Sequence, residues 1–390
     1  MSAVAESQAL FLDEVRRVAR EICGPTADDV DREARFPIEA MNALREAGAL
    51  SALVPTDLGG RGIAFETVAS ACFELGRDCA ATAMIFAMHQ IQVGCLVRHA
   101  LGAPFFDEYL TRLCAEQFLI ASATSEIGVG GDLRTSIAAV TPDGDAFVLE
   151  KKAPTVSYGG HADDVLITVR RAPDAGAADQ VAVLAHRHEL TLDPSSGWDP
   201  LGMRGTCSPG FVVKARFSAD HVVPEAFGPI AEQTMVPFSH ILWAHVWLGI
   251  ATAASDKARA FVRSQARQNP SATAPTPRLS ELAAMLHGMR GEIAAATAEY
   301  VALSEVGESA EDAFTIRYAL RINALKLNAS ELAPRICAAA LGVCGIAGYR
   351  NDSPFSVGRH LRDALSAPLM IANDRIHAAN ATMLLVSKDG

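Results

Sequence analysis

The stretch LGVCGIAGYRNDSPFSVGRHLRDALSAPLMIANDRI, residues 341–376, decides the fold of this chain. It opens with three glycines between 342 and 348, just after a long amphipathic run. Glycines in that position end a helix and let the backbone approach a ligand or another chain closely. An Arg-Asp pair at 362–363 follows, then a nearly uncharged run to Ile371 and a polar triplet at 373–375. This spacing predicts a helix end, a loop and one last helix.

Composition limits the classes of function that the chain can have. Its 390 residues are 50% hydrophobic and 20% charged, which suits two or three domains with a large core. The net charge of −11, with no Lys/Arg-rich block, argues against nucleic acid as a partner. Eight scattered cysteines form no CxxC pair, so we expect a reducing, cytoplasmic location, no disulfides and no metal site. The N-terminus lacks the basic region of a signal peptide.

Two uncharged runs, residues 79–97 and 233–255, are each long enough to cross a bilayer. Both contain polar side chains, among them His89 in the first run and His240 in the second. Such groups are costly in lipid. We therefore predict that both runs are core helices of a large helical protein, and that the chain has no membrane partner.

Periodicity divides the chain into three parts. Residues 1–118 carry apolar side chains at helical spacing. Residues 119–231 contain short runs rich in Val, Ile, Leu and Phe, separated by turn signals, which predicts a small antiparallel β domain. Residues 232–390 return to long helical runs with short connections, the pattern of a bundle.

Four motifs resemble the acyl-CoA dehydrogenase family. They are LVPTDLGGRG at 53–62, LGMRGTCSPGFVVKARFSADHVVPEAFG at 201–228, GIAGY at 345–349 and RDA at 362–364. The resemblance covers essentially the whole chain. It implies an α+β, mainly α fold with an N-terminal helical bundle, a small middle β domain and a C-terminal four-helix bundle. It also implies an FAD cofactor and assembly as a homotetramer or homodimer.

The segment ATSEIGVGGDLR, residues 123–134, resembles a flavin-facing loop of that family. The resemblance places Ser125 where a family threonine binds the flavin pyrimidine through its hydroxyl and its backbone N–H, and it assigns the neighbouring Thr124 to the cofactor as well. It places Gly131 where a family serine contacts the substrate thioester. Gly131 can still offer its backbone N–H, but it has no hydroxyl.

The segment KKAPTVSYGGHADDVLI, residues 151–167, resembles a second flavin-facing loop. Val156 and Ser157 are the implied cofactor contacts, with Ser157 at the place where a hydroxyl faces flavin N5. A hydroxyl there can hydrogen-bond the ring as it gains charge on reduction. The glycine and Ala-Asp pairs that follow are in the family register.

Further cofactor and substrate contacts follow from the resemblance. Gly345 and Ile346 correspond to a glycine loop that touches a flavin bound mainly by the neighbouring subunit. Arg267 is near the family arginine that reaches that subunit's pyrophosphate, within a register of one or two residues. Asn373 is assigned to the cofactor, and His89 to the substrate.

The family's catalytic position departs from the pattern. The glutamate that removes the substrate α-proton often lies eight residues after the Asp of the RDA motif, and that position is Ile371 here. An isoleucine accepts no proton. Other members carry the base ten residues before a helical glycine, and counting back from Gly249 gives Ser239, with His240 beside it. His240 is then a candidate base, and the alternative is a buried structural histidine.

Three functions remain open. The first is α,β-desaturation of an acyl thioester, carried by CoA or by an acyl-carrier protein, with an atypical base and with electron-transfer flavoprotein or oxygen as the acceptor. The second is a flavin-dependent monooxygenase of the same fold, in which His89, Ser157, His240 and Asn373 would surround the flavin. The third is a catalytically silent subunit that pairs with an active paralogue.

Overall fold

The computed structural model describes residues 3–130, 132–269, 277–304 and 315–387. The N-terminal part is helical, as its periodicity predicts. Its helices are α1 (Ala3–Val18), α2 (Gly24–Glu33), α3 (Ile38–Glu46), α4 (Phe65–Asp78), α5 (Ala80–His99) and α6 (Pro104–Glu116). Helix α5 is buried on all sides because its sequence is apolar around the whole circumference, and it forms the centre of the molecule.

The middle part contains two sheets rather than one. Its strands are β1 (Ile120–Ala123), β2 (Thr141–Asp143), β3 (Ala146–Ala153), β4 (Asp164–Arg170), β5 (Gln180–His186), β6 (Leu190–Pro194) and β7 (Phe211–Phe217). The four-stranded sheet, in the order β2-β3-β7-β6, is antiparallel throughout. The three-stranded sheet has the order β1-β4-β5, and β1 runs parallel to β4. The expectation of a purely antiparallel domain is therefore wrong at β1.

The C-terminal part is built from long helices. Its elements are α7 (Phe227–Ile230), α8 (Val236–Gln268), α9 (Pro277–Ser304), α11 (Ile316–Cys344), α12 (Ile346–Tyr349), α13 (Gly358–Ala364) and α14 (Asn373–Val386). Helices α8, α9 and α11 pack along one another, and α4 and α5 of the first part join them. The molecule is mainly α with a small β part, as the resemblance implied.

Both long uncharged runs lie inside the molecule. Helix α5 and the helical stretch that includes α8 are apolar and long enough to cross a membrane, but 89% of the most apolar window of each is buried. The prediction of two core helices is therefore confirmed. Helix α8 approaches α4 closely at Gly76 and Gly249, where a Cβ on either glycine would lie less than 3 Å from the opposite backbone.

Helix α14 does not join the bundle along its length. It projects away from the rest of the chain, on the side opposite the N-terminal helices. Its last apolar residues are largely exposed: Leu384 by 53%, Leu385 by 87% and Val386 by 66%. In a single chain this helix therefore presents an uncovered apolar end.

Candidate functional site

The two segments that resemble flavin-facing loops lie side by side. Thr124 and Ser125 follow β1, and Val156 and Ser157 follow β3. The Ser125 hydroxyl donates to the Thr155 carbonyl at 3.1 Å, which joins the two loops directly. Val156 is fully buried, so its side chain anchors the second loop in the core.

A buried lysine fixes the orientation of the first loop. Lys151 on β3 donates from Nζ to the Thr124 carbonyl at 3.0 Å and to the Thr168 carbonyl at 2.6 Å. Its pKa is lowered to about 8 by burial, although the Glu126 carboxylate 3.9 Å away opposes that shift. The peptide between Thr124 and Ser125 is trans, so its N–H points opposite to its carbonyl. The Ser125 N–H is therefore directed away from Lys151.

These loops fit a flavin by their free donors. Within the described residues, neither the Ser125 N–H nor the Ser157 N–H has an acceptor in the chain. A flavin ring presents carbonyl and nitrogen acceptors at its edge, which such donors satisfy. The predicted set of Thr124, Ser125, Val156 and Ser157 is therefore assembled in one place, although the predicted contact at Gly131 lies outside the described residues.

His89 connects two backbone segments in the core. Its ring is fully buried, and Nδ1 accepts the Ile120 N–H at 3.0 Å while Nε2 lies 2.8 Å from the Leu50 carbonyl. Burial lowers its pKa to about 4, so the ring is neutral and carries its proton on Nε2. Because both nitrogens bind backbone, His89 offers no group to a substrate. The assignment of His89 to the substrate stays a prediction that these two backbone bonds do not favour.

Neither candidate base on α8 is suited to accept a proton. The Ser239 hydroxyl donates to the Met235 carbonyl one turn earlier, at 2.6 Å. His240 is buried, and neither of its ring nitrogens makes a hydrogen bond of good geometry within the described chain. Burial and the nearby Lys326 ammonium lower its pKa to about 3, opposed by the Val236 backbone and the Asn323 side chain. A group so hard to protonate is a poor general base.

Ile371, at the family's base position, has an unusual backbone. Its φ is +52°, in the left-handed region that β-branched residues rarely adopt. Its side chain is 40% exposed in the single chain. Backbone bonds from Met370 to Ser366 and from Asn373 to Pro368 hold the turn on both sides. The structure thus holds an apolar side chain, in a constrained turn, where the family places a carboxylate.

The Asn373 side chain, at the start of α14, forms hydrogen bonds with residues of α11. Its Oδ1 accepts from Lys326 at 2.5 Å and from Ser330 at 3.2 Å, and its Nδ2 donates to Ser330 and Glu331. The side chain is 9% exposed. Both ends of the Asn373 amide are occupied by these bonds, so its assignment to the cofactor stays a prediction that this geometry does not favour.

Lys326 is the residue that sequence reasoning missed. It lies on α11, is fully buried, and sits 6.0 Å from the centre of the Trp247 ring. No carboxylate of the described chain lies within salt-bridge distance of it. Burial lowers its pKa to about 8, and Glu331 opposes that shift. A single lysine in an amphipathic run is usually exposed, so the sequence pattern did not predict that Lys326 is buried.

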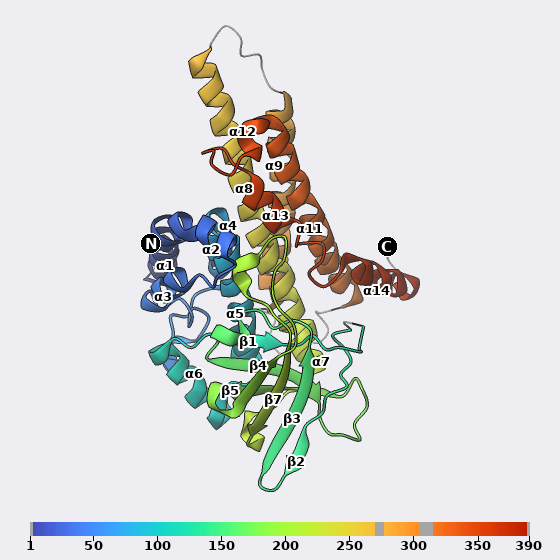
Figure 1. Cartoon of the computed structure of the whole chain (residues 1–390). Coiled ribbons are helices and arrows are strands. Elements are labelled where there is room, and N and C mark those ends of the chain that lie inside the picture. Colours follow the sequence, from blue (N-terminus) through green and yellow to red (C-terminus); the bar gives the residue numbers. More distant parts are fainter. Residues whose placement is uncertain (1–2, 131, 270–276, 305–314, 388–390) are drawn as a thin grey trace.

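Three further predicted cofactor residues lie elsewhere. Arg267 is exposed near the end of α8, and Gly345 and Ile346 lie at the junction of α11 and α12. Figure 1 shows both places toward the upper end of the bundle, away from the β strands. Ile346 is 74% exposed, and Gly345 has a φ of +57° that suits glycine. One chain therefore does not bring these residues to Ser125 and Ser157.

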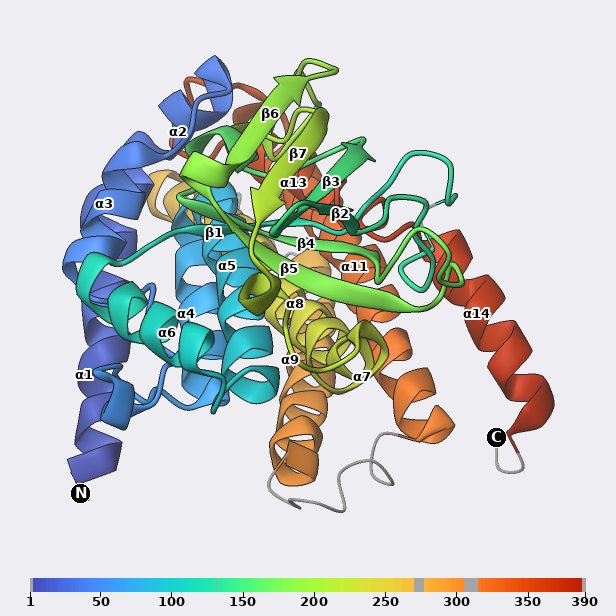
Figure 2. The same ribbon diagram turned by 90° about the horizontal axis from the view of Figure 1, so that it is seen from below.

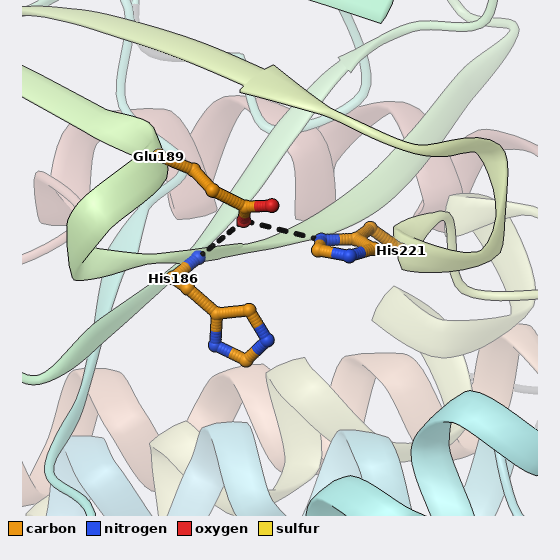
Figure 3. Close-up of side chains that lie close together, drawn as sticks. All are labelled: His186, Glu189 and His221. Atoms are coloured by element: carbon orange, nitrogen blue, oxygen red, sulfur yellow. Dashed lines mark hydrogen bonds and ion pairs between the residues drawn. The ribbon is translucent and has the colours of Figure 1, made fainter. Parts of the chain in front are cut away.

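A cluster that the sequence did not predict joins His186, Glu189 and His221 (Figure 3). Glu189 accepts the His186 backbone N–H at 3.0 Å and lies 3.3 Å from His221 Nδ1. The His221 Nδ1 is also 3.0 Å from the Leu184 carbonyl, and the His186 Nδ1 is 3.1 Å from the Asp164 carboxylate. These bonds cap the short helical turn Arg187–Glu189, so we read the cluster as structural.

Comparisons with known proteins agree with this fold. At 26% identity over 380 residues, the chain is similar to cyclohex-1-ene-1-carbonyl-CoA dehydrogenase of Syntrophus aciditrophicus, covering 96% of this chain and 89% of that protein. It is 28% identical over 360 residues to L-evernosamine nitrososynthase of a Micromonospora species, covering 88% of this chain and 82% of that protein. The crystal structure of dibenzothiophene monooxygenase from Paenibacillus sp. A11-2 superposes with a TM-score of 0.79 at 19% identity, covering 97% of both chains.

Two family models match the chain. The acyl-CoA dehydrogenase N-terminal domain matches residues 5–117, and the acyl-CoA dehydrogenase C-terminal domain matches residues 231–379. Together they span about two thirds of the sequence, on either side of the β domain. Members of this family bind FAD. The chain belongs to the acyl-CoA dehydrogenase family.

Proposed function

We propose that this protein is a flavin-dependent monooxygenase built on the acyl-CoA dehydrogenase fold. The observation that carries the proposal is Ile371, an apolar residue held in a constrained turn at the position of the family base. Desaturation requires a group that removes the substrate α-proton. Neither Ser239 nor His240 is placed to replace it, because the first is bonded within its helix and the second is buried with a lowered pKa.

The residues for a flavin are those of the two joined loops. The backbone donors of Ser125 and Ser157 would hold the ring, and Lys151 keeps the Ser125 donor turned toward it. FAD bound there and reduced by an external two-electron donor, such as a reduced nicotinamide or a reduced flavin, would supply the electrons with which dioxygen gives one oxygen atom to a substrate and the other to water. The chain's own contribution is to position the ring and to keep a proton acceptor away from position 371.

The comparisons support an oxygenase without excluding a dehydrogenase. A nitrososynthase is among the relatives, and a monooxygenase is among the similar structures. The cyclohexene-carbonyl-CoA dehydrogenase relative favours a thioester substrate instead. We choose the oxygenase over the dehydrogenase because this sequence has isoleucine, and no carboxylate, at position 371.

A second function is favoured by one specific observation, the buried Lys326. An amine with a pKa of about 8 can take up a proton near neutral pH, and it lies against Asn373, two residues from Ile371. Desaturation of a CoA-bound or carrier-bound acyl thioester would then use Lys326 in its neutral form. The electron acceptor in this case would be an electron-transfer flavoprotein or oxygen.

The two functions separate in an anaerobic experiment. FAD-loaded protein is mixed without oxygen with butyryl-CoA, hexanoyl-CoA and cyclohexanecarbonyl-CoA, and the visible flavin absorbance is followed. The oxygenase proposal expects no bleaching, followed by rapid reoxidation by oxygen after chemical reduction. Bleaching by a thioester would refute it and support desaturation.

Two variants sharpen the result. If a thioester does bleach the protein, Lys326→Met should slow bleaching by about 10²- to 10⁴-fold when Lys326 is the base. If none does, Ile371→Glu supplies a carboxylate at the family position and should create slow bleaching. A protein that takes up no flavin at all would instead point to the silent-subunit function.

We also propose that the protein acts as a homotetramer or homodimer. The end of α8 and the α11–α12 junction, which carry Arg267, Gly345 and Ile346, lie at the end of the bundle away from β1 and β3 (Figure 1), so a flavin that contacts these residues as well as the loops after β1 and β3 lies between subunits in this proposal. The exposed apolar end of α14 offers a surface for such a contact. Light scattering of the FAD-loaded protein tests this, and a flavin-saturated monomer would contradict it.

A further inference from the structure

A line of hydroxyl groups leads to Ser157 from the loop before β7. Thr206 and Ser208 are both buried, with 4% and 3% of their surface exposed. The Thr206 and Ser208 hydroxyl oxygens are 2.9 Å apart, and the Ser208 hydroxyl donates to the Ser157 hydroxyl oxygen at 2.9 Å. Three side-chain hydroxyls from two loops therefore form one chain that ends at the predicted flavin contact.

The backbone around this line is strained. Tyr158, Met203 and Cys207 have φ values of +45°, +53° and +43°, all in the left-handed region although none is glycine. A residue in this region raises the energy of the folded backbone and persists only where its surroundings fix it. Such residues tend to gather at functional sites, and three of the six found in the described part of the chain lie in the two loops that carry Ser157 and Ser208.

The strained residues are locked to one another and to the last part of the chain. The Tyr158 N–H donates to the Thr206 carbonyl at 2.8 Å and to the Cys207 carbonyl at 3.0 Å. The Met203 N–H donates to the Asp363 carboxylate on α13 at 2.7 Å. The Tyr158 bonds therefore join the two loops beside Ser157 and Ser208, and the Met203 bond joins the second loop to α13.

The number of protons on the three hydroxyls determines the direction of the bonds between them. A hydroxyl has one proton to donate. The Ser208 proton has two acceptors within reach, the Ser157 hydroxyl oxygen at 2.9 Å and the Thr206 carbonyl at 3.3 Å, and we assign it to the shorter bond, to Ser157. Thr206 then donates to Ser208 or to the Met203 carbonyl, 2.9 Å away. The Ser157 oxygen already accepts a bond, which leaves its own proton to be donated elsewhere. The Ser157 O–H therefore points away from Ser208 and is available to donate a hydrogen bond to another group.

We propose that Ser208 is a positioning residue that orients the Ser157 hydroxyl so that its proton is directed to the flavin. The inference rests on the proposed flavin site, and it adds a residue that the resemblance does not assign to the cofactor. Ser208 does not touch the ring. It acts by occupying one side of the Ser157 oxygen, and a charged or reduced acceptor gains more from such a donor than a neutral one.

The test measures the flavin itself rather than turnover. Ser208→Ala removes the orienting donor, and the reduction potential of the bound FAD is measured by equilibration with a dye of known potential. We expect about a tenfold smaller equilibrium constant for reduction, which is about 30 mV more negative for a two-electron couple. Ser208→Thr keeps the hydroxyl and should restore the potential to that of the wild type.

A double-variant cycle separates orientation from general loosening of the loop. If Ser208 acts only through Ser157, adding Ser208→Ala to Ser157→Ala should shift the potential no further than Ser157→Ala alone. Additive shifts, or an unchanged potential in Ser208→Ala, would overturn the proposal. If the alanine variant does not fold, Ser208→Cys replaces the hydroxyl by a thiol, which is a weak donor, and the reduction potential should again become more negative. Failure of the wild type to bind FAD would instead refute the proposed flavin site.

Discussion

Replacing the buried Lys326 by methionine should stabilise this protein at neutral pH. Lys326 is fully buried, makes one hydrogen bond, to Asn373, and has no carboxylate partner within salt-bridge distance in the described chain. A buried ammonium without such a partner raises the free energy of the folded state. Methionine has a similar length, and Asn373 keeps the bond from Ser330 in the variant.

The magnitude follows from the pKa of Lys326, which falls from 10.5 to about 8 on folding. Each unit of pKa difference corresponds to about 1.4 kcal/mol, so the charged form costs about 3 kcal/mol of stability wherever both states are protonated, below pH 8. As the pH rises from about 8 to 10.5, the folded state releases the proton before the unfolded state does. The unfolding free energy of the wild type therefore rises with pH across that window.

Urea unfolding of the wild type and of Lys326→Met at pH 7 and at pH 9.5 measures both effects. We expect the variant to be more stable at pH 7 by about 1–3 kcal/mol, the lower end allowing for the lost hydrogen bond. We expect that advantage to shrink by about 2 kcal/mol at pH 9.5. Lys152→Met, on an exposed position of β3, is the matched control and should show neither effect. A Lys326→Met protein that is less stable at pH 7, or whose advantage is the same at both pH values, would refute the reasoning.

Three further predictions test other parts of the molecule. Ile371→Gly should change the unfolding free energy by less than about 1 kcal/mol by urea unfolding, because relief of the left-handed backbone offsets the loss of a partly buried side chain; a loss of more than about 2 kcal/mol would show that the turn is not strained. His240→Gln should lower turnover on any substrate by less than about tenfold, because a base contributes about 10²- to 10⁴-fold and a buried neutral ring does not; a larger loss with an unchanged flavin spectrum would restore His240 as the base. Leu385→Glu should give a smaller species by light scattering with unchanged helix content by circular dichroism, because this side chain is 87% exposed in the single chain; an unchanged mass would exclude the end of α14 from the assembly contact.

The helices and the order of the three parts could be predicted because both depend on local patterns. The α5 sequence is apolar all round, and a helix of that kind has to be buried. The loops at Ser125 and Ser157 could be located by motif, and the structure brings them together through the bond from Ser125 to Thr155. The parallel pairing of β1 with β4 could not be predicted, because pairing depends on contacts between segments far apart in the chain.

The roles of individual polar residues were less accessible from the sequence. His89 and Asn373 have the side chains that a flavin or substrate site would use, but packing places both against groups of the same chain. Lys326 resembles a surface lysine until the packing of α8 and α11 is known. In each case the deciding quantity is burial together with the available partners, and the local pattern contains neither.

The buried Lys326 ammonium lies close to the turn that carries Ile371, because it donates to Asn373 two residues later. A carboxylate close to a buried ammonium has a lowered pKa, which weakens it as a base. Lys326 holds Asn373, two residues beyond Ile371, so this chain places a cation next to the turn from which the family's base acts. A glutamate at position 371 that reached Lys326 would have a lowered pKa, so it would take a proton from carbon only slowly. The apolar residue at 371 and the cation behind it therefore both oppose proton abstraction by a carboxylate at this turn, so the proposed oxygenase function involves the α11–α14 contact as well as one side chain.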